Sequence, residues 1–278
     1  MRLKMLKKFP VKFGLLWKAL KKFNEDNGFF LSSGIAFNIL INLIPFILLL
    51  LALVGTYLYN HQEVINHIRG YLKNVAPTLD PKIIGMLMSL MESRKIVGIL
   101  GFIGLIWFST WVFHCLRIAL NIVLKAEKNR GMLQGIGIDL LMILFTGIFL
   151  LVSLLLSSMI IFLQDYQGLI PVAIGPIIKW ILKYLLPFFF SYAMFFLIYK
   201  IIPNKKVRIS SALQAALFAS LLWELAKHLF TWYVVHLAQY SFFYGSLSTL
   251  IIFVFWVFYS STILLLGGEF VYFLEEDQ

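Results

Sequence analysis

The sequence is poor in cysteine and in charge, and each scarcity restricts what the protein can be. Cys115 is the single cysteine, so no disulfide can form within the chain. Charged residues make up 13% of the 278 residues, whereas a typical soluble domain contains about 25%. Four long runs carry no Asp, Glu, Lys or Arg, namely residues 27–62, 96–116, 140–164 and 228–268. A membrane span needs about 20 mostly apolar residues, so these runs exclude a large soluble domain and indicate an all-α, polytopic membrane protein.

Sequence patterns of common soluble enzymes are also missing. The chain has neither a P-loop nor a Gly-x-Ser-x-Gly motif. Its five histidines show no metal-ligand spacing, and the pair formed by His61 and His67 is a weak metal signal. We therefore expect no catalytic centre, no metal and no cofactor.

The basic residues are concentrated at positions that predict topology. The net charge is +11, and eight Lys or Arg lie within the first 22 residues. Two short loops, at 121–134 and 202–208, carry more of them, while the loops at 164–175 and 237–245 carry none. By the positive-inside rule, the basic loops and both termini are cytoplasmic. The charge therefore describes orientation and does not predict a nucleic-acid partner.

Six transmembrane helices are predicted, at residues 31–59, 96–120, 135–163, 176–201, 209–236 and 246–273. They form a single multi-pass domain, residues 29–278, in the cell inner membrane, and a cytoplasmic basic helix precedes it within residues 1–28. The loop at 60–95 has five basic residues, yet we assign it outside because the flanking spans require it. No cleavable signal peptide is evident, since the basic first 22 residues lack an uninterrupted apolar stretch.

Amphipathic segments lie outside the predicted spans. Between residues 1 and 23, apolar side chains recur at helical spacing and most lysines lie off that stripe. This pattern is typical of an interfacial helix on the anionic cytoplasmic leaflet. In the loop at 60–95, the apolar spacing predicts two short external helices. Asp80-Pro81 supplies an N-cap and a first-turn proline for the second of them.

Two prolines raise the question of an internal repeat. Pro45 and Pro187 each lie about a dozen residues into a predicted span, in halves of opposite orientation. Interrupted helices at matching positions of inverted halves are typical of many transporters. Prolines are also common in membrane helices, so a repeat and a coincidence both stay open.

The most informative single residue is Glu224, a carboxylate within apolar sequence. A charge at the centre of a membrane costs roughly 2.5–3.5 kcal/mol, so it usually faces a partner or a polar cavity. Lys227 and His228 follow at i+3 and i+4 and lie on adjoining helix faces. With Lys183 they form a polar layer near the outer side of the membrane. A charged gate, a proton-linked site and an ion pair that joins helices are the alternatives.

A polar stripe follows the second predicted span and must face protein or water. Four residues at helical spacing form it: Thr110, His114, Arg117 and Asn121. Arg117 can pair with Asp139 or Glu269 at similar depth, or bind an anionic lipid head group. Snorkelling of Arg117 to the cytoplasmic interface is the alternative.

Deep amides and small residues complete the set of candidates. Asn38 and Asn42 lie one turn apart in the first span, where amides either join helices by hydrogen bonds or line a pathway. Gly267 and Gly268 allow close helix contact next to Glu269 in the last span.

A series of short motifs follows the chain in a defined order and spacing. They are Ala36-Phe37 through Pro45, Ala119-Leu120-Asn121, Pro203-Asn204-Lys205-Lys206-Val207, Trp223-Glu224-Leu225-Ala226-Lys227 with Phe230 and Tyr233, Tyr244-Gly245-Ser246, Trp256, Tyr259 and Leu266-Gly267-Gly268-Glu269. Taken together, over residues 20–275, the motifs resemble those of the YihY/BrkB family of bacterial inner-membrane proteins.

The resemblance carries expectations about function. Members of this family have been linked to virulence and serum resistance, and some to the movement of lipids or lipopolysaccharide precursors. An older label, ribonuclease BN, is generally regarded as mistaken, and the lack of a hydrated His/Asp cluster agrees with rejecting it. The sequence departs from the family pattern at Asn38 and Asn42, where Tyr and Ser are common, and at Gln214-Ala215, where Pro-Gly is common. The last departure removes an expected kink.

The sequence therefore favours an inner-membrane transporter or flippase-like protein for an amphipathic, anionic, lipid-like substrate, with membrane lipids as its partners. In this interpretation Glu224 and Lys227 form an outer gate, Arg117 contacts the head group, and Asn38 and Asn42 line the path. A non-transporting scaffold of the cell envelope is the alternative, and a membrane-embedded enzyme is the third. A homo-oligomer is compatible with each of them.

Overall fold

The computed structural model describes residues 13–58, 81–126, 130–165, 184–236 and 246–276, and these residues form helices without any strand. The helices are α1 (Phe13–Glu25), α2 (Gly28–Leu58), α4 (Pro81–Glu92), α5 (Arg94–Val123), α6 (Met132–Asp165), α8 (Leu186–Ile201), α9 (Ile209–His236) and α11 (Ser246–Glu276). The predicted all-α class is confirmed for this part of the chain.

Five of the helices, α2, α5, α6, α9 and α11, are long and apolar enough to cross a membrane. They correspond to five of the six predicted spans and differ from them by a few residues at their ends. The sixth predicted span, 176–201, is represented by α8, which has 16 residues and is shorter than a full crossing needs. Its first part lies outside the described residues, as do Lys183, His61, His67 and the first of the two short external helices. The sixth crossing therefore stays a prediction.

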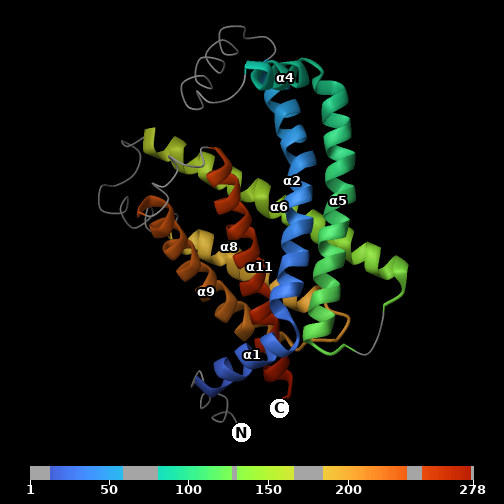
Figure 1. Ribbon diagram of the computed structural model, residues 1–278, viewed down its shortest axis with the longest axis vertical. Coiled ribbons are helices and arrows are strands. Elements are labelled where there is room, and N and C mark those ends of the chain that lie inside the picture. Colours follow the sequence, from blue (N-terminus) through green and yellow to red (C-terminus); the bar gives the residue numbers. More distant parts are fainter. Residues whose placement is uncertain (1–12, 59–80, 127–129, 166–183, 237–245, 277–278) are drawn as a thin grey trace.

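The beginning of α1 and the end of α11 lie at the same end of the molecule (Figure 1). This arrangement agrees with two termini on one side of the membrane, while the identity of that side stays a prediction from the basic loops. At the turn between α1 and α2, Asn27 has a φ of 55° and Gly28 begins the next helix. The expected turn after the first helix is therefore present.

α1 is amphipathic, but its buried face differs from the predicted stripe. Of the predicted stripe, Phe23 is buried in the protein, whereas Leu20 is 49% exposed; Trp17, beside the stripe, is 72% exposed. Ala19 and Lys22 take part in the buried face, which packs on α2 and α11. The sequence analysis placed most lysines off the apolar stripe, yet Lys22 is buried, and buried acceptors compensate its charge.

Glycines bring α2 and α5 together as a long antiparallel pair (Figure 1). A Cβ atom at Gly101 would lie 2.8 Å from the backbone nitrogen of Leu49, and one at Gly104 would lie 3.1 Å from the Cβ of Pro45. Larger residues on α5 would force the two helices apart. α4 lies across the end of this pair, so the predicted helix that begins after Asp80 is confirmed.

α11 lies at the centre of the bundle and contacts α1, α2, α5, α8 and α9. The buried face of α9 consists largely of small residues: Ser211, Ala212, Ala215, Ala216, Ala219 and Ser220. Small residues allow the close approach on which membrane helices depend. α6 runs obliquely across the bundle in Figure 1 and contacts α5 and α8.

The two prolines of the possible repeat both lie in helical structure. Pro45 is buried within α2, and Pro187 is the second residue of α8, directly after two π-helical residues, Tyr184 and Leu185. A π-helical turn is itself a local interruption of an α-helix. The residues before 184 lie outside the described part of the chain, so the inverted repeat stays a prediction.

Candidate functional site

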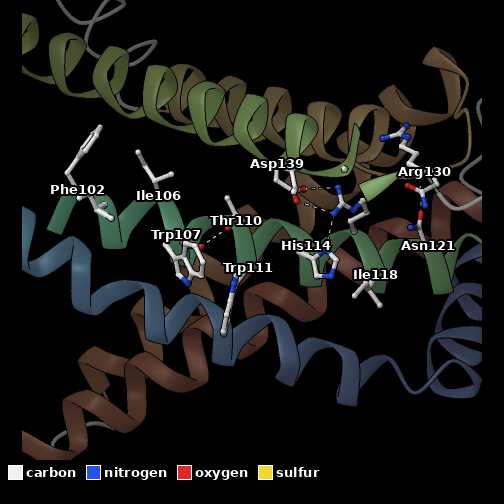
Figure 2. Close-up of a pocket in the computed structure, with 16 residues that line it drawn as sticks. Phe102, Ile106, Trp107, Thr110, Trp111, His114, Ile118, Asn121, Arg130 and Asp139 are labelled. Carbon is white, nitrogen blue, oxygen red and sulfur yellow. Dashed lines mark hydrogen bonds and ion pairs between the residues drawn. The ribbon is translucent and has the colours of Figure 1, made fainter. Parts of the chain in front are cut away.

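A groove of about 750 Å³ lies between α5 and α6 and extends to the loop that follows α8 (Figure 2). Its polar end is lined by His114, Arg117, Asn121, Arg130, Asp139 and Asn204. The rest is lined mainly by aliphatic and aromatic side chains of α5, including Phe102, Ile103, Ile106, Trp107 and Trp111. The groove is thus amphipathic along the direction of α5.

Arg117 and Asp139 join α5 to α6 at the polar end of the groove. Arg117 Nη1 lies 3.1 Å from Asp139 Oδ1, and Nη2 donates to Asp139 Oδ2 at 3.1 Å. Nη2 also lies 2.8 Å from His114 Nδ1. Both members of the ion pair are buried, with 8% and 2% of their surface exposed. The sequence analysis left Asp139 and Glu269 as possible partners of Arg117, and in the structure the partner is Asp139.

Gly135 provides the space for this guanidinium. A Cβ atom at Gly135 would lie 2.7 Å from Arg117 Nη1 and 2.9 Å from its Cζ. Gly135 lies one turn before Asp139 on α6, so the same helix supplies the acceptor and the room beside it. The sequence prediction did not identify this glycine, and its spacing from Asp139 was the available signal.

Arg130 lies at the loop end of the groove and was predicted only as a topology residue. Its Nη1 donates to the carbonyl oxygen of Ile201 at 3.0 Å. Nearby, Asn121 Oδ1 accepts a hydrogen bond from the backbone nitrogen of Asn204 at 2.8 Å. These contacts tie the end of α5 to the end of α8 and its following loop. The polar stripe of α5 therefore continues onto a second structural element that the sequence did not reveal.

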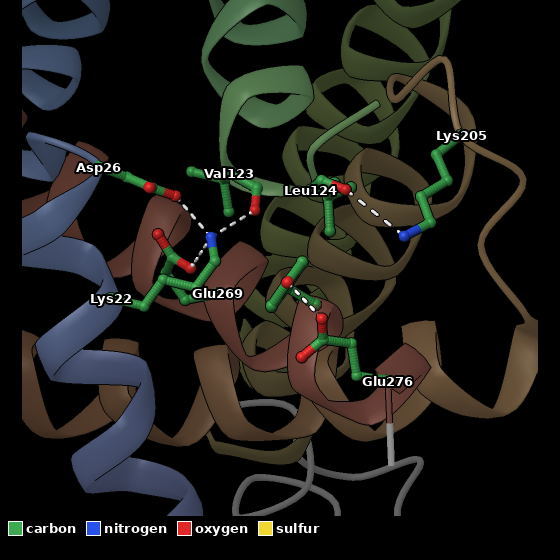
Figure 3. Close-up of polar contacts among 8 residues, drawn as sticks. Lys22, Asp26, Val123, Leu124, Lys205, Glu269 and Glu276 are labelled. Atoms are coloured by element: carbon green, nitrogen blue, oxygen red, sulfur yellow. Dashed lines mark hydrogen bonds and ion pairs between the residues drawn. The ribbon is translucent and has the colours of Figure 1, made fainter. Parts of the chain in front are cut away.

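A second polar cluster connects α1, α5 and α11 (Figure 3). Lys22 Nζ donates to Glu269 Oε2 at 2.9 Å, to Asp26 Oδ2 at 2.5 Å and to the carbonyl oxygen of Val123 at 2.7 Å. It also lies 4.2 Å from the centre of the Tyr272 ring, within the range of a cation–π contact. Glu269 was expected in helix packing, and its partner Lys22 was missed. The i,i+4 spacing of Lys22 and Asp26 was the signal available.

Glu224 and Lys227 form an ion pair within α9, with 2.6 Å between Lys227 Nζ and Glu224 Oε1. Their side chains are 27% and 33% exposed, and His228 is exposed. None of the three lines the groove between α5 and α6. Glu224 and Arg117 therefore line no common pocket among the described residues, and a shared polar pathway stays a prediction. The i+3 spacing allows Lys227 to satisfy Glu224 within its own helix.

The two amides of α2 have different roles. Asn42 Nδ2 donates to Ser109 Oγ at 3.1 Å and so links α2 to α5. Asn38 Nδ2 donates to the carbonyl oxygen of Gly34 at 2.8 Å, within its own helix. Asn38 also borders a separate pocket of about 380 Å³ beside His114. Helix packing, one of the two predicted alternatives, accounts for Asn42.

Gly267 and Gly268 are points of close contact on α11. A Cβ atom at Gly267 would overlap the Tyr199 hydroxyl of α8, and one at Gly268 would lie 2.9 Å from Leu120 Cδ2 of α5. Tyr199 is fully buried and its hydroxyl donates to the Leu264 carbonyl oxygen at 2.9 Å. Close packing next to Glu269 was predicted and is present. Among the described residues, no group of three or more His, Cys, Asp or Glu is arranged to hold a metal ion.

The helices and the buried polar contacts between them define a polytopic α-helical membrane protein. Residues 19–278 match the family described as Virulence factor BrkB. The chain belongs to this family, as the order of its motifs indicated.

Relatives in sequence occur in several bacteria. A UPF0761 membrane protein of Glaesserella parasuis serovar 5 (strain SH0165) is 30% identical over 205 residues, which is 73% of this chain and 71% of the relative. The UPF0761 membrane protein NTHI0384 of Haemophilus influenzae (strain 86-028NP) is 24% identical over 269 residues, 95% of each chain. These names describe membrane proteins and assign no catalytic activity. No solved structure matches this chain.

Proposed function

We propose that this protein is an inner-membrane transporter or flippase-like protein for an anionic, lipid-like amphiphile, and that the groove between α5 and α6 is its substrate site. The observation that carries the proposal is the lining of the groove, which has cations at one end and aliphatic and aromatic side chains along the rest. Such a surface complements the two parts of an anionic amphiphile, and ligand sites in general combine apolar walls with a few placed polar groups.

The apolar part of the groove is longer than one leaflet is deep. Phe102 and Arg117 are separated by 15 positions on α5, which is about 22 Å at 1.5 Å per residue, whereas half of a bilayer core of about 30 Å is about 15 Å. The groove therefore has room for the chains of a lipid whose head group lies at its polar end, and these chains pass Trp111 and Trp107.

The polar end of the groove lies beside the basic loops that we predict to be cytoplasmic. The inner leaflet is therefore the source that we propose for the substrate. α1 lies at the same end of the molecule (Figure 1), and its exposed face combines Trp17 and Leu20 with Lys18 and Lys21. This combination favours the surface of an anionic leaflet.

A non-transporting scaffold is the second candidate, and the polar clusters outside the groove favour it. Lys22–Glu269 and Glu224–Lys227 are ion pairs satisfied within the protein, as structural contacts are. In our proposal these pairs stabilise the bundle, and the substrate site is confined to the groove. A scaffold function predicts that changes in the groove alter activity only as far as they lower protein abundance.

A membrane-embedded enzyme is the third candidate, and one contact bears on it. Such an enzyme needs a histidine and a carboxylate at one point, and His114 and Asp139 both contact Arg117. Asp139 is engaged through both oxygens by the guanidinium, which favours a structural role for this carboxylate over that of a base.

Lipid translocation in proteoliposomes tests the proposed function. Chain-labelled fluorescent phosphatidylglycerol is followed by chemical quenching of the outer leaflet, with and without an imposed proton gradient. We expect wild type to exceed empty vesicles, Ile106→Trp to lower the rate at least tenfold by filling the groove, and Ile122→Trp to leave it unchanged. Ile122 is exposed on α5 but does not line the groove. Equal rates for the two variants, or a wild-type rate equal to that of empty vesicles, would overturn the proposal.

A further inference from the structure

The charge of Arg117 is already compensated inside the protein. Its guanidinium pairs with Asp139 through two contacts of 3.1 Å, and both residues are buried. The Nη2 contact is a hydrogen bond, whereas Nη1 and Oδ1 lie at ion-pair distance and have no hydrogen-bond partner in the described part of the chain. An arginine paired in this way has little net charge to offer a ligand. Arg117 and Asp139 therefore form an ion pair without net charge that lines the polar end of the groove.

Arg130 differs from Arg117 in this respect. Its Nη1 donates hydrogen bonds to the backbone carbonyl oxygens of Ile201 and Ile202, at 3.0 and 3.5 Å. Within the described residues no carboxylate lies within ion-pair distance of it. Partial burial and the neighbouring charge of Arg117 lower the pKa of Arg130 below its usual value, which is the effect expected where positive charge is not balanced.

The net charge of the groove lining follows from these residues. Arg117 and Arg130 contribute two positive charges and Asp139 one negative charge, so the described lining carries +1 with His114 neutral. A partly desolvated charge without a counter-ion is unfavourable, and a ligand that supplies the counter-ion removes that cost. One negative charge on the ligand is sufficient.

We propose that Arg130 is the residue that binds the head group, and that the groove prefers amphiphiles with a single negative charge, as on a phosphodiester head group, over zwitterionic and dianionic ones. This inference deepens the proposed function and rests on the groove being the substrate site. In this arrangement Arg117 is a positioning residue, because its ion pair with Asp139 holds α6 against α5. Arg130 contacts the ligand.

Native mass spectrometry of the full chain with lipids of identical acyl chains tests the inference. The probes are phosphatidylglycerol, phosphatidylethanolamine and phosphatidic acid at pH 8, where a phosphate monoester with a second pKa of about 6 carries two charges. For wild type we expect phosphatidylglycerol to bind about tenfold tighter than phosphatidylethanolamine, and tighter than phosphatidic acid. Arg130→Gln should remove the preference over phosphatidylethanolamine, and Arg130→Lys should retain it.

Two further variants make the result specific. Lys206→Gln removes an exposed cation that does not line the groove and should leave the preference unchanged. Asp139→Asn raises the lining to +2 and should shift the preference toward phosphatidic acid. If Lys206→Gln and Arg130→Gln have equal effects, the preference belongs to the general surface charge and the inference is wrong.

Failure of the inference can be separated from failure of the proposed function. If phosphatidylglycerol and phosphatidylethanolamine bind saturably with equal affinity, and Ile106→Trp weakens both, the groove holds lipid but the charge rule is wrong. If no lipid binds saturably, or Ile106→Trp has no effect on binding, the groove is not the substrate site and both proposals fail.

Discussion

Lys22 Nζ lies 2.9 Å from Glu269 Oε2, and the contact joins residues 247 positions apart in the sequence. Both are buried, and Glu269 has no exposed surface at all. Through this contact the amphipathic helix α1, which we predict to lie on the membrane surface, is fixed to the central helix α11. The position of α1 is therefore determined in part by a contact within the protein.

Removing Lys22 should destabilise the protein strongly. Lys22→Met leaves Glu269 buried without a counter-ion, and breaking a buried pair in this way costs about 3–5 kcal/mol in the free energy of unfolding. Glu269 Oε1 has no hydrogen-bond partner in the described part of the chain, so little else compensates the charge. Thermal unfolding in detergent, followed by tryptophan fluorescence, measures the change.

The double variant Lys22→Met/Glu269→Met is the informative comparison for this cluster. It removes both charges, so it should be more stable than Lys22→Met alone. Lys21→Met is the matched control, because Lys21 and Glu25 are exposed and 3.8 Å apart, and such pairs contribute about 0–1 kcal/mol. Equal destabilisation by Lys21→Met and Lys22→Met would show that the buried pair has no special role.

Gly267 should tolerate no side chain. Gly267→Ala places a methyl group against the Tyr199 hydroxyl and 3.0 Å from Ala219 Cβ, so we expect a loss of about 1–3 kcal/mol, as for other overpacked positions. Gly137→Ala is the control, because a Cβ atom at Gly137 meets no atom within 4 Å. Tyr199→Phe added to Gly267→Ala should recover part of the loss in thermal stability. A Gly267→Ala protein as stable as wild type would contradict the helix contact described here.

Glu224→Gln distinguishes a gate from a stabilising pair. Because Glu224 and Lys227 bind each other on α9 and do not line the groove, we expect wild-type lipid translocation in proteoliposomes and a slightly lower thermal stability. A folded, fully abundant Glu224→Gln protein without translocation would instead support the outer gate that the sequence suggested. Protein abundance and rate must be measured on the same preparation.

The two amides of α2 should respond differently to substitution. Asn42→Ala removes the bond to Ser109 between two helices, and such bonds contribute about 0.6–2 kcal/mol in membrane proteins. Asn38→Ala removes a bond within its own helix and a side-chain contact with the Cys115 thiol of α5. Because a thiol is a weak hydrogen-bond partner, this change should cost less. Chemical unfolding of the two variants in mixed micelles gives the order. A larger loss for Asn38→Ala would contradict this order.

Much of the helical framework could be predicted from hydropathy alone. The span predicted at 209–236 coincides with α9, and the others that are fully described end within a few residues of α2, α5, α6 and α11. Long apolar runs are determined locally, by the need to satisfy every backbone group inside a membrane. The polar stripe of α5 could also be identified from the sequence, because its helical spacing does not depend on the neighbouring helices.

The partners of the polar residues could not be predicted in the same way. The predicted depth in the membrane allowed Arg117 to pair with either of two carboxylates. The oblique course of α6 brings Asp139, one of the two, next to Arg117. Depth also placed Glu224 in a pathway, although Lys227 satisfies it locally. Lys22 was assigned to the membrane surface because its helix was considered without α11. Each of these outcomes depends on which helix faces lie together, and one sequence does not contain that information.

Photo-crosslinking tests most directly the claim that the groove between α5 and α6 holds a lipid. The purified protein is irradiated in nanodiscs with phosphatidylglycerol that carries a diazirine on its acyl chain, and the adducts are located by peptide mass spectrometry. Our account predicts adducts concentrated between Phe102 and Trp111 that decrease when excess unlabelled phosphatidylglycerol is added. Adducts spread evenly over exposed apolar residues of α2, α5 and α11, and unaffected by competitor, would contradict it.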